Sequence, residues 1–156
     1  MKAREVRVFL PHPALPGADW ADCFEISAAN SGLDAEAAAR QAFERMPKWV
    51  GPLMVLRNLI VRPFGLKGGR DTAAAGAPRI GMFPVISRSD AETVLGFDDR
   101  HLDFRIVVQT EPCGKGETRV RLMTLIRRHN FVGRAYLAAI TLFHKLIVAT
   151  ALSRIG

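Results

Sequence analysis

The second half of the chain holds its most regular pattern, because apolar and polar residues alternate over several consecutive runs. In the runs 100–110 and 118–128 every second residue is apolar, which is typical of a β-strand that buries one face. Two shorter runs, 80–87 and 92–97, precede them. Polar turns, and a loop at 111–117 that contains Pro and Gly, separate the runs. Such short connections predict an antiparallel meander.

A long, nearly all-apolar helix is predicted from Arg134 to about Arg154. A helix that packs on one sheet needs about one apolar stripe, and this helix has further apolar side chains outside its stripe. The surplus indicates either a second covering surface, in a dimer or a domain contact, or an apolar cavity that the helix lines. The pattern leaves both open. The stripe consists of Tyr136, Ile140, Phe143, Ile147 and Ala151.

Two polar residues, His144 and Lys145, interrupt this helix near its middle. A lysine at the centre of a bilayer costs about 3 kcal/mol. We therefore predict that the helix is buried in protein and that the chain has no transmembrane segment.

The N-terminal half begins with an arm or edge strand at 1–18, followed by a first strand at 20–26. Two short helices come next. The segment 65–79 is rich in Gly and Ala and has no large apolar anchor after Leu66, which predicts a flexible loop. It lacks the Gly-Lys-Ser/Thr ending of a phosphate-binding loop.

The boundaries of the two short helices follow from capping residues and prolines. Asp34 can cap the first helix, which carries a stripe of alanines and ends at Pro47. The second, about 50–62, has Pro52 in its first turn, where proline is tolerated. It is apolar over most of its circumference.

This order of elements predicts the α+β class: a curved antiparallel sheet wrapped around a long C-terminal helix, with two short helices after the first strand. A length of 156 residues suits a single domain over 1–156.

Composition narrows the class of partner. The formal charge of +7 and the pI near 10.2 could attract anionic lipid, nucleic acid or acidic partners. The arginines are dispersed and there is one Tyr for base stacking, so we expect no nucleic-acid binding. Cys23 and Cys113 match no metal or redox spacing, and no signal peptide is apparent, which predicts a cytoplasmic protein with free thiols.

His101, Asp103 and Arg105 share one face of the strand 100–110. One interpretation is a ladder of cross-strand ion pairs on the solvent side. The other makes His101 a proton carrier oriented by Asp103, with Arg105 holding an anion. The second requires that this polar face, and not the apolar one, points into a pocket.

Arg57 is an unusual residue for an otherwise apolar helix, because a half-buried guanidinium needs an acceptor. The acceptor could be a structural partner or the carboxylate of a ligand.

The junction between the last strand and the last helix gathers His129, Asn130, Gly133, Arg134 and Tyr136. Asn130 can act as a turn or cap residue, and Gly133 permits a close approach of the chain. The cluster is either a structural turn or the rim of a pocket. The sequence lacks the motifs of hydrolases, metalloproteases and Rossmann proteins, and we predict no metal and no cofactor.

Several of these pieces resemble a bacterial family, domain of unknown function 2867. The resemblance implies a fold similar to the START-like helix-grip (SRPBCC) superfamily, the birch-pollen-allergen type, whose members commonly bind hydrophobic ligands. The matching pieces span nearly the whole chain: Ala18-Asp19-Trp20, Pro47-Lys48-Trp49-Val50, Leu56-Arg57-Asn58, Phe64-Gly65-Leu66-Lys67, Ile80-Gly81-Met82-Phe83-Pro84, His101-Leu102-Asp103-Phe104-Arg105, His129-Asn130, Gly133-Arg134-Ala135-Tyr136 and Phe143-His144.

We therefore predict a non-enzymatic module that binds a lipophilic small molecule between the sheet and the last helix. Arg57 or Arg134 would meet a polar head group at the mouth. One alternative is a cyclase-like or isomerase-like enzyme that uses His101 or His129 with Asp103, and another is a module that forms a homodimer through the last helix. The expected lining residues are Phe104, Leu122, Tyr136, Ile140, Phe143 and Ile147.

Overall fold

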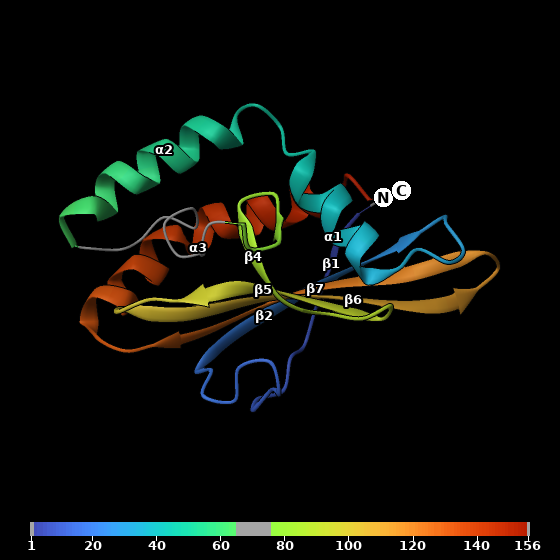
Figure 1. Ribbon diagram of the computed structural model, residues 1–156, viewed down its shortest axis with the longest axis horizontal. Helices are drawn as coiled ribbons and strands as arrows, with labels where there is room; N and C mark the ends of the chain where they lie inside the picture. Colours follow the sequence, from blue (N-terminus) through green and yellow to red (C-terminus); the bar gives the residue numbers. More distant parts are fainter. Residues whose placement is uncertain (1, 65–75, 156) are drawn as a thin grey trace.

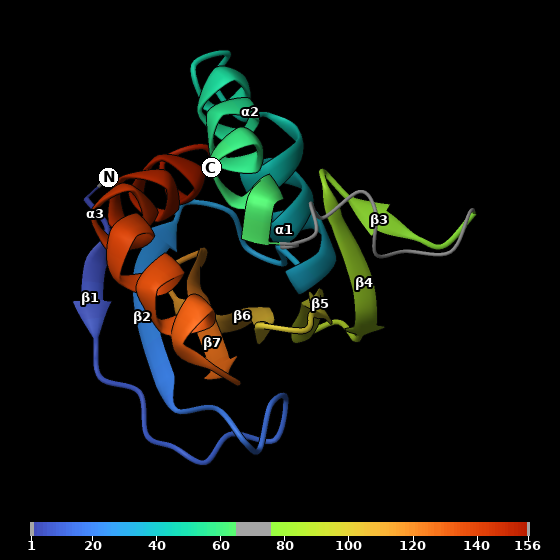
Figure 2. The same cartoon turned by 90° about the vertical axis from the view of Figure 1, so that its left-hand side faces the viewer.

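The computed structural model of the chain describes residues 2–64 and 76–155, without the side chains of residues 53, 57, 60, 61, 64 and 142. A seven-stranded, fully antiparallel sheet forms the body, in the order β1-β2-β7-β6-β5-β4-β3. The sheet curves into a trough that holds the helices (Figure 2). The strands are β1 (Arg4–Val6), β2 (Trp20–Ala28), β3 (Arg79–Ile80), β4 (Phe83–Arg88), β5 (Glu92–Asp98), β6 (Leu102–Gly114) and β7 (Glu117–Arg128).

Three α-helices and one 3-10 turn lie on the inner face of this sheet (Figure 1). The C-terminal helix α3 runs back over β2 and β7, whereas α1 packs on β5 and β6. In both views α2 forms the outermost layer, above α3 (Figures 1 and 2). The α+β prediction, with a sheet bent around the C-terminal helix, is confirmed in these coarse terms. The helical elements are α1 (Ala35–Glu44), α2 (Val50–Val61), η1 (Arg62–Phe64) and α3 (Phe131–Leu152).

The main core lies between the inner face of the sheet and the helices α1 and α3. The alternating residues predicted to face inward do so, and they meet the alanines of α1 and the C-terminal half of α3. Alanines let α1 lie close to the strands. Members of this core include Phe24, Ile26, Ala38, Ala42, Ile106, Val108, Val120, Leu122, Val148 and Leu152.

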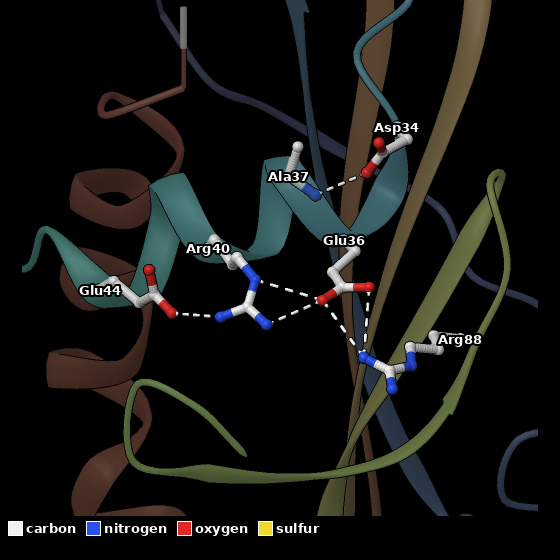
Figure 3. A network of polar contacts seen from close by, with 6 residues as sticks. All are labelled: Asp34, Glu36, Ala37, Arg40, Glu44 and Arg88. Carbon is white, nitrogen blue, oxygen red and sulfur yellow. Dashed lines mark hydrogen bonds and ion pairs between the residues drawn. The ribbon is translucent and has the colours of Figure 1, made fainter. Parts of the chain in front are cut away.

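An ion network fixes α1 in the trough (Figure 3). Asp34 caps the helix, since its Oδ1 accepts a hydrogen bond of 2.7 Å from the backbone N–H of Ala37, as predicted. Arg40 bridges the carboxylates of Glu36 and Glu44 along the helix, and Glu36 also reaches Arg88 at the end of β4, 3.4 Å away. The network therefore joins α1 to the edge of the sheet.

The outer face of the sheet is covered in part by the N-terminal arm, which crosses beneath β2 (Figure 2). Leu15 of the arm is buried in a second, smaller apolar cluster. The predicted edge strand is β1, and the rest of the arm covers this outer cluster. It contains Leu15, Cys23, Val94, Val107, Met123 and Leu125.

Two predicted boundaries differ from the structure in the meander. The run 80–87 is two strands, because the chain reverses at Gly81 between β3 and β4. Gly81 has a φ of 60°, and a Cβ there would lie 2.9 Å from the carbonyl oxygen of Phe43, so only glycine fits. The predicted turn at 111–117 is mostly strand: β6 continues to Gly114, and Lys115 and Gly116 alone join it to β7.

The predicted flexible loop, 65–79, falls largely outside the described residues, since 65–75 are not described. Arg79 at its end belongs to β3.

The long helix begins at Phe131, earlier than the predicted Arg134, because Asn130 caps it. The Oδ1 atom of Asn130 accepts a hydrogen bond of 3.1 Å from the N–H of Gly133. Within the described residues no single helix is long and apolar enough to cross a membrane. The two halves of α3, which are bent by 60°, reach that length and composition only when they are taken together.

Candidate ligand-binding site

An apolar groove of about 390 Å³ separates α2 from α3 on the surface of the molecule. Trp49 lies directly before α2, and Phe143 and Leu146 belong to α3. The volume falls in the range of sites for small molecules, about 300–1,000 Å³. The described residues that line it are Trp49, Pro52, Leu56, Phe143 and Leu146.

The groove exists because α2 stands apart from the sheet. The helix α2 is apolar on nearly every side, and a helix of that composition is normally buried. Here Leu56 is 53% exposed on α2, and Phe143 and Leu146 are 52% and 55% exposed on α3. Large apolar side chains that face solvent together mark a binding surface more often than a stable free surface.

On the inner face of the sheet, a row of phenylalanine rings runs from Phe43 of α1 over β4, β5 and β6. Phe83 contacts Phe43 and Phe104 edge to face, with ring centroids 5.3 Å and 5.7 Å apart, and Phe97 lies 4.6 Å from Phe104. Phe83, Phe97 and Phe104 are only half-buried. The row is therefore an apolar floor that solvent still reaches.

Three of the predicted lining residues pack around one buried cluster, and one of them, Phe104, also belongs to the row of phenylalanines. Phe104, Tyr136 and Ile140 pack around the buried cluster of Leu102, Ile126 and Leu137. Each of the three is half-buried.

The other predicted lining residues are dispersed. Leu122 lies in the main core, 1% exposed, and Ile147 is half-buried on α3. Phe143 lines the outer groove, and Arg134 is exposed near the start of α3. The side chain of Arg57 is outside the described residues.

A polar cluster that the sequence interpretation did not select lies under the middle of α3. The Nε2 atom of His144 lies 3.1 Å from Oδ2 of Asp22 and 3.3 Å from Oγ1 of Thr124, and Trp20 packs edge to face on the imidazole. Asp22 and Thr124 are paired across β2 and β7. The sequence did hold a signal for this cluster. Two polar residues occupy inward positions of apolar strands, and one histidine interrupts an apolar helix.

This cluster is not a nucleophilic triad. In such a triad the carboxylate and the hydroxyl contact opposite nitrogens of the imidazole. Here both contact Nε2 of His144, so the ring cannot pass a proton from Thr124 toward Asp22. The geometry supports a structural link that joins α3 to β2 and β7.

The predicted acid–base residues lie on the other side of the sheet or at its end. Asp103 pairs with His129, whose Nε2 is 2.9 Å from Oδ1 of the carboxylate, and Arg105 pairs with Asp98 at 2.8 Å. His101 is buried, and its Nδ1 lies 2.9 Å from Nδ2 of Asn130. Asp103 thus orients His129 and not His101, which corresponds to the ion-pair interpretation of this face.

A second hollow, of about 340 Å³, lies on the outer face between the sheet and the N-terminal arm. Burial raises the pKa of the Cys23 thiol there from 9.0 to about 11, partly offset by Arg121. Arg4 and Arg121 together lower the pKa of Glu25 in the same wall. The carboxylate of Glu25 already pairs with both arginines, so the hollow offers a ligand few open polar groups. Among the described residues no three His, Cys, Asp or Glu gather closely enough to hold a metal ion.

The fold and the groove define an α+β domain in which a curved antiparallel sheet holds a long C-terminal helix. A family model described as "Protein of unknown function (DUF2867)" matches residues 14–151. The chain belongs to this family. No curated protein matches it.

One solved structure with some likeness is the human StarD13 (DLC2) lipid transfer and protein localization domain. Its sequence is 10% identical, and the alignment covers 87% of this chain and 77% of that one. The TM-score is 0.29, which is too low to support an argument about the fold.

Proposed function

We propose that this protein binds a lipophilic small molecule whose apolar body lies in the groove between α2 and α3. The observation that carries the proposal is the described lining, whose residues are all apolar, open to solvent and arranged around a groove of suitable volume. Removing the exposed surface of Leu56, Phe143 and Leu146 from water would supply the main driving force.

The half-buried row of phenylalanines on the inner face of the sheet would extend the proposed site inward. A longer ligand would pass from the groove toward Phe104 and Tyr136, two of the residues that the sequence interpretation placed around the cavity. The START-like relationship implied by the family resemblance supports the same ligand class. The side chain of Arg134 is exposed at the start of α3, and it is the candidate for contact with a polar head group among the side chains that the structure describes.

The enzymatic alternative has less support. Its best-formed pair, Asp103 and His129, lies on the face of the sheet that points away from α2 and α3. A substrate in the groove would not reach it.

The first experiment is native mass spectrometry of the purified protein, with a solvent extract of the same sample. An adduct that is lost on denaturation and recovered in the extract would establish binding and identify the molecule. A clean monomer mass would count against a tightly held ligand, and a clean dimer mass would favour the alternative of a homodimer.

A second experiment uses the neutral dye N-phenyl-1-naphthylamine and the two tryptophans of the chain. Because Trp49 lines the groove whereas Trp20 packs on His144 beneath α3, bound dye should quench Trp49 in the Trp20→Phe protein more strongly than it quenches Trp20 in the Trp49→Phe protein. The variant Leu146→Glu should lose dye binding, since it places a charge in the groove. Its control is Ile86→Glu on β4, which is 49% exposed against 55% for Leu146 and lines neither hollow. Equal binding by both variants would contradict the proposed site.

A further inference from the structure

We propose that the outward face of α2, together with the exposed side of α3, docks on an anionic lipid surface. This surface is separate from the floor of the groove, and the proposal does not require that the groove hold a ligand. It rests on the exposed apolar side chains and on the sign of the charges around them.

The outward stripe of α2 is apolar and ends in a cation. Val55 and Leu59 are each 60% exposed, and Arg62 follows them at the same helical spacing, i, i+4 and i+7. None of the three lines the groove. An amphipathic helix that lies in a membrane interface places such apolar side chains among the lipid chains and its basic residues at the head groups.

The exposed side of α3 also combines apolar and basic side chains. Phe131, at its first turn, is 82% exposed. Arg134 is one turn further on, exposed and adjacent to Ala135 and Ala138, which are also exposed. The side thus offers apolar and basic groups and no carboxylate of its own.

The charged residues of the two helical segments themselves are all basic. The segment 45–64 contains Arg45, Lys48, Arg57 and Arg62 but no Asp or Glu, and no acidic residue follows Glu117 anywhere in the sequence. Lys145 on α3 does face a carboxylate, since its Nζ lies 3.2 Å from Glu5. Within the described part of the chain, Arg62 and Arg134 have no acidic partner.

This distribution favours an anionic membrane over a second copy of the chain. A two-fold dimer brings the same patch of each copy together, so these cations would face cations. An anionic bilayer attracts each of them by about 1 kcal/mol near its surface. The apolar side chains then gain burial in the lipid instead of in a partner protein.

Co-sedimentation with lipid vesicles tests the proposal on the full chain. Vesicles of phosphatidylcholine with phosphatidylglycerol should bind the protein, vesicles of phosphatidylcholine alone should bind it weakly, and salt should lower the binding. The variant Leu59→Glu should weaken binding about tenfold, which is the effect of losing one buried leucine. Glutamate is a good helix former, so α2 should persist.

Two matched controls isolate the surface. Ile86→Glu adds the same charge at an exposed apolar position on β4 and should bind as the unmodified protein does. Arg62→Glu and Lys115→Glu change the net charge equally, but Lys115 lies at the β6–β7 turn, so only Arg62→Glu should reduce binding. Equal effects of both members of either pair would overturn the proposal, as would equal binding to the two kinds of vesicle.

Dye binding distinguishes the proposal of membrane docking from the proposal of a ligand in the groove. Leu59→Glu should leave the binding of N-phenyl-1-naphthylamine unchanged, and Leu146→Glu should abolish it whether or not vesicles bind. If Leu59→Glu instead converts a dimer into a monomer in sedimentation velocity, the face is an interface between copies and the membrane proposal is overturned.

Discussion

Nε2 of His144 on α3 lies 3.1 Å from Oδ2 of Asp22 on β2, between the sheet and the helix that the sheet holds. The carboxylate is 5% exposed, so its charge is almost entirely removed from water. A buried polar group needs a partner, and among the described residues the hydrogen bond with the imidazole falls on Oδ1, 3.3 Å away, while Oδ2 makes none. The pair therefore fixes where the middle of α3 lies on the sheet.

We predict that Asp22→Ala lowers the free energy of unfolding by about 2 kcal/mol, because it removes the carboxylate beside His144 and, in the described part of the chain, leaves only the hydroxyl of Thr124 near Nε2. The double variant Asp22→Leu/His144→Leu should regain much of this loss, since apolar residues of similar volume often replace a buried pair at little cost. Urea denaturation measures both. Glu117→Ala, at an exposed carboxylate, is the control. A double variant no more stable than the single one would show that the pair is not the cause.

Gly133 should not tolerate a side chain. A Cβ there would lie 2.2 Å from the carbonyl oxygen of His101, so Gly133→Ala must push the first turn of α3 away from β6. The expected cost is about 3 kcal/mol, the upper part of the range for overpacking. Gly51→Ala, in the first turn of α2, meets nothing within 4 Å and should be neutral or slightly stabilising. Thermal unfolding of the two variants would show the contrast, and similar melting temperatures would refute it.

The two thiols should differ in reactivity. Cys23 is 1% exposed and its pKa is raised to about 11 by burial, whereas Cys113 is partly exposed. Iodoacetamide near pH 8 should therefore modify Cys113 alone in the folded protein and both cysteines in urea. Intact-mass spectrometry counts the adducts. Rapid modification of Cys23 under native conditions would mean that the N-terminal arm leaves the outer face.

The raised pKa of Cys23 also predicts a loss of stability at alkaline pH. Between pH 9 and pH 11 the folded state holds a proton that the unfolded state has released, so stability is complete below pH 9 and falls as the pH rises toward 11. Cys23→Ala should remove this dependence. Urea midpoints at pH 8 and near pH 10.5 measure it in both proteins.

Glu25 should give stability the opposite dependence on pH, with a loss at acidic pH. Its pKa is lowered below 4.5, first by the hydrogen bond from Arg4 and then by Arg121, so its contribution to stability is present above pH 4.5 and is lost as the pH falls further. Glu25→Gln should be less stable than the unmodified protein at pH 7 and more nearly equal to it near pH 3. If the difference between the two proteins were the same at both values, the ion pairs would not be its source.

The sequence predicted most elements because local rules decide them. The alternation in 100–110 fixes which face of β6 is buried, and Asp34 and Asn130 begin their helices through contacts with residues only three positions away. The break in the run 80–87 was missed because it depends on the carbonyl oxygen of Phe43, a residue far away in the sequence.

The candidate site was only partly predictable. Phe143 was predicted to line a cavity against the sheet, but it lines an outer groove opposite Leu56 of α2, and no spacing rule relates two helices that are distant in sequence. Asp103 shares a strand face with His101 in the sequence, yet pairing between β6 and β7 brings it to His129.

By itself the sequence determined the α+β class, the strand faces, the helix caps and the excess of apolar and basic residues near its C-terminal helix, because these depend on neighbours within a few residues. Only the tertiary structure decided that α2 stands away from the sheet, that a groove opens between Trp49 and Phe143, and that Asp22 meets His144. Those relationships are set by packing between segments far apart in the chain, where the shape and volume of many side chains act together.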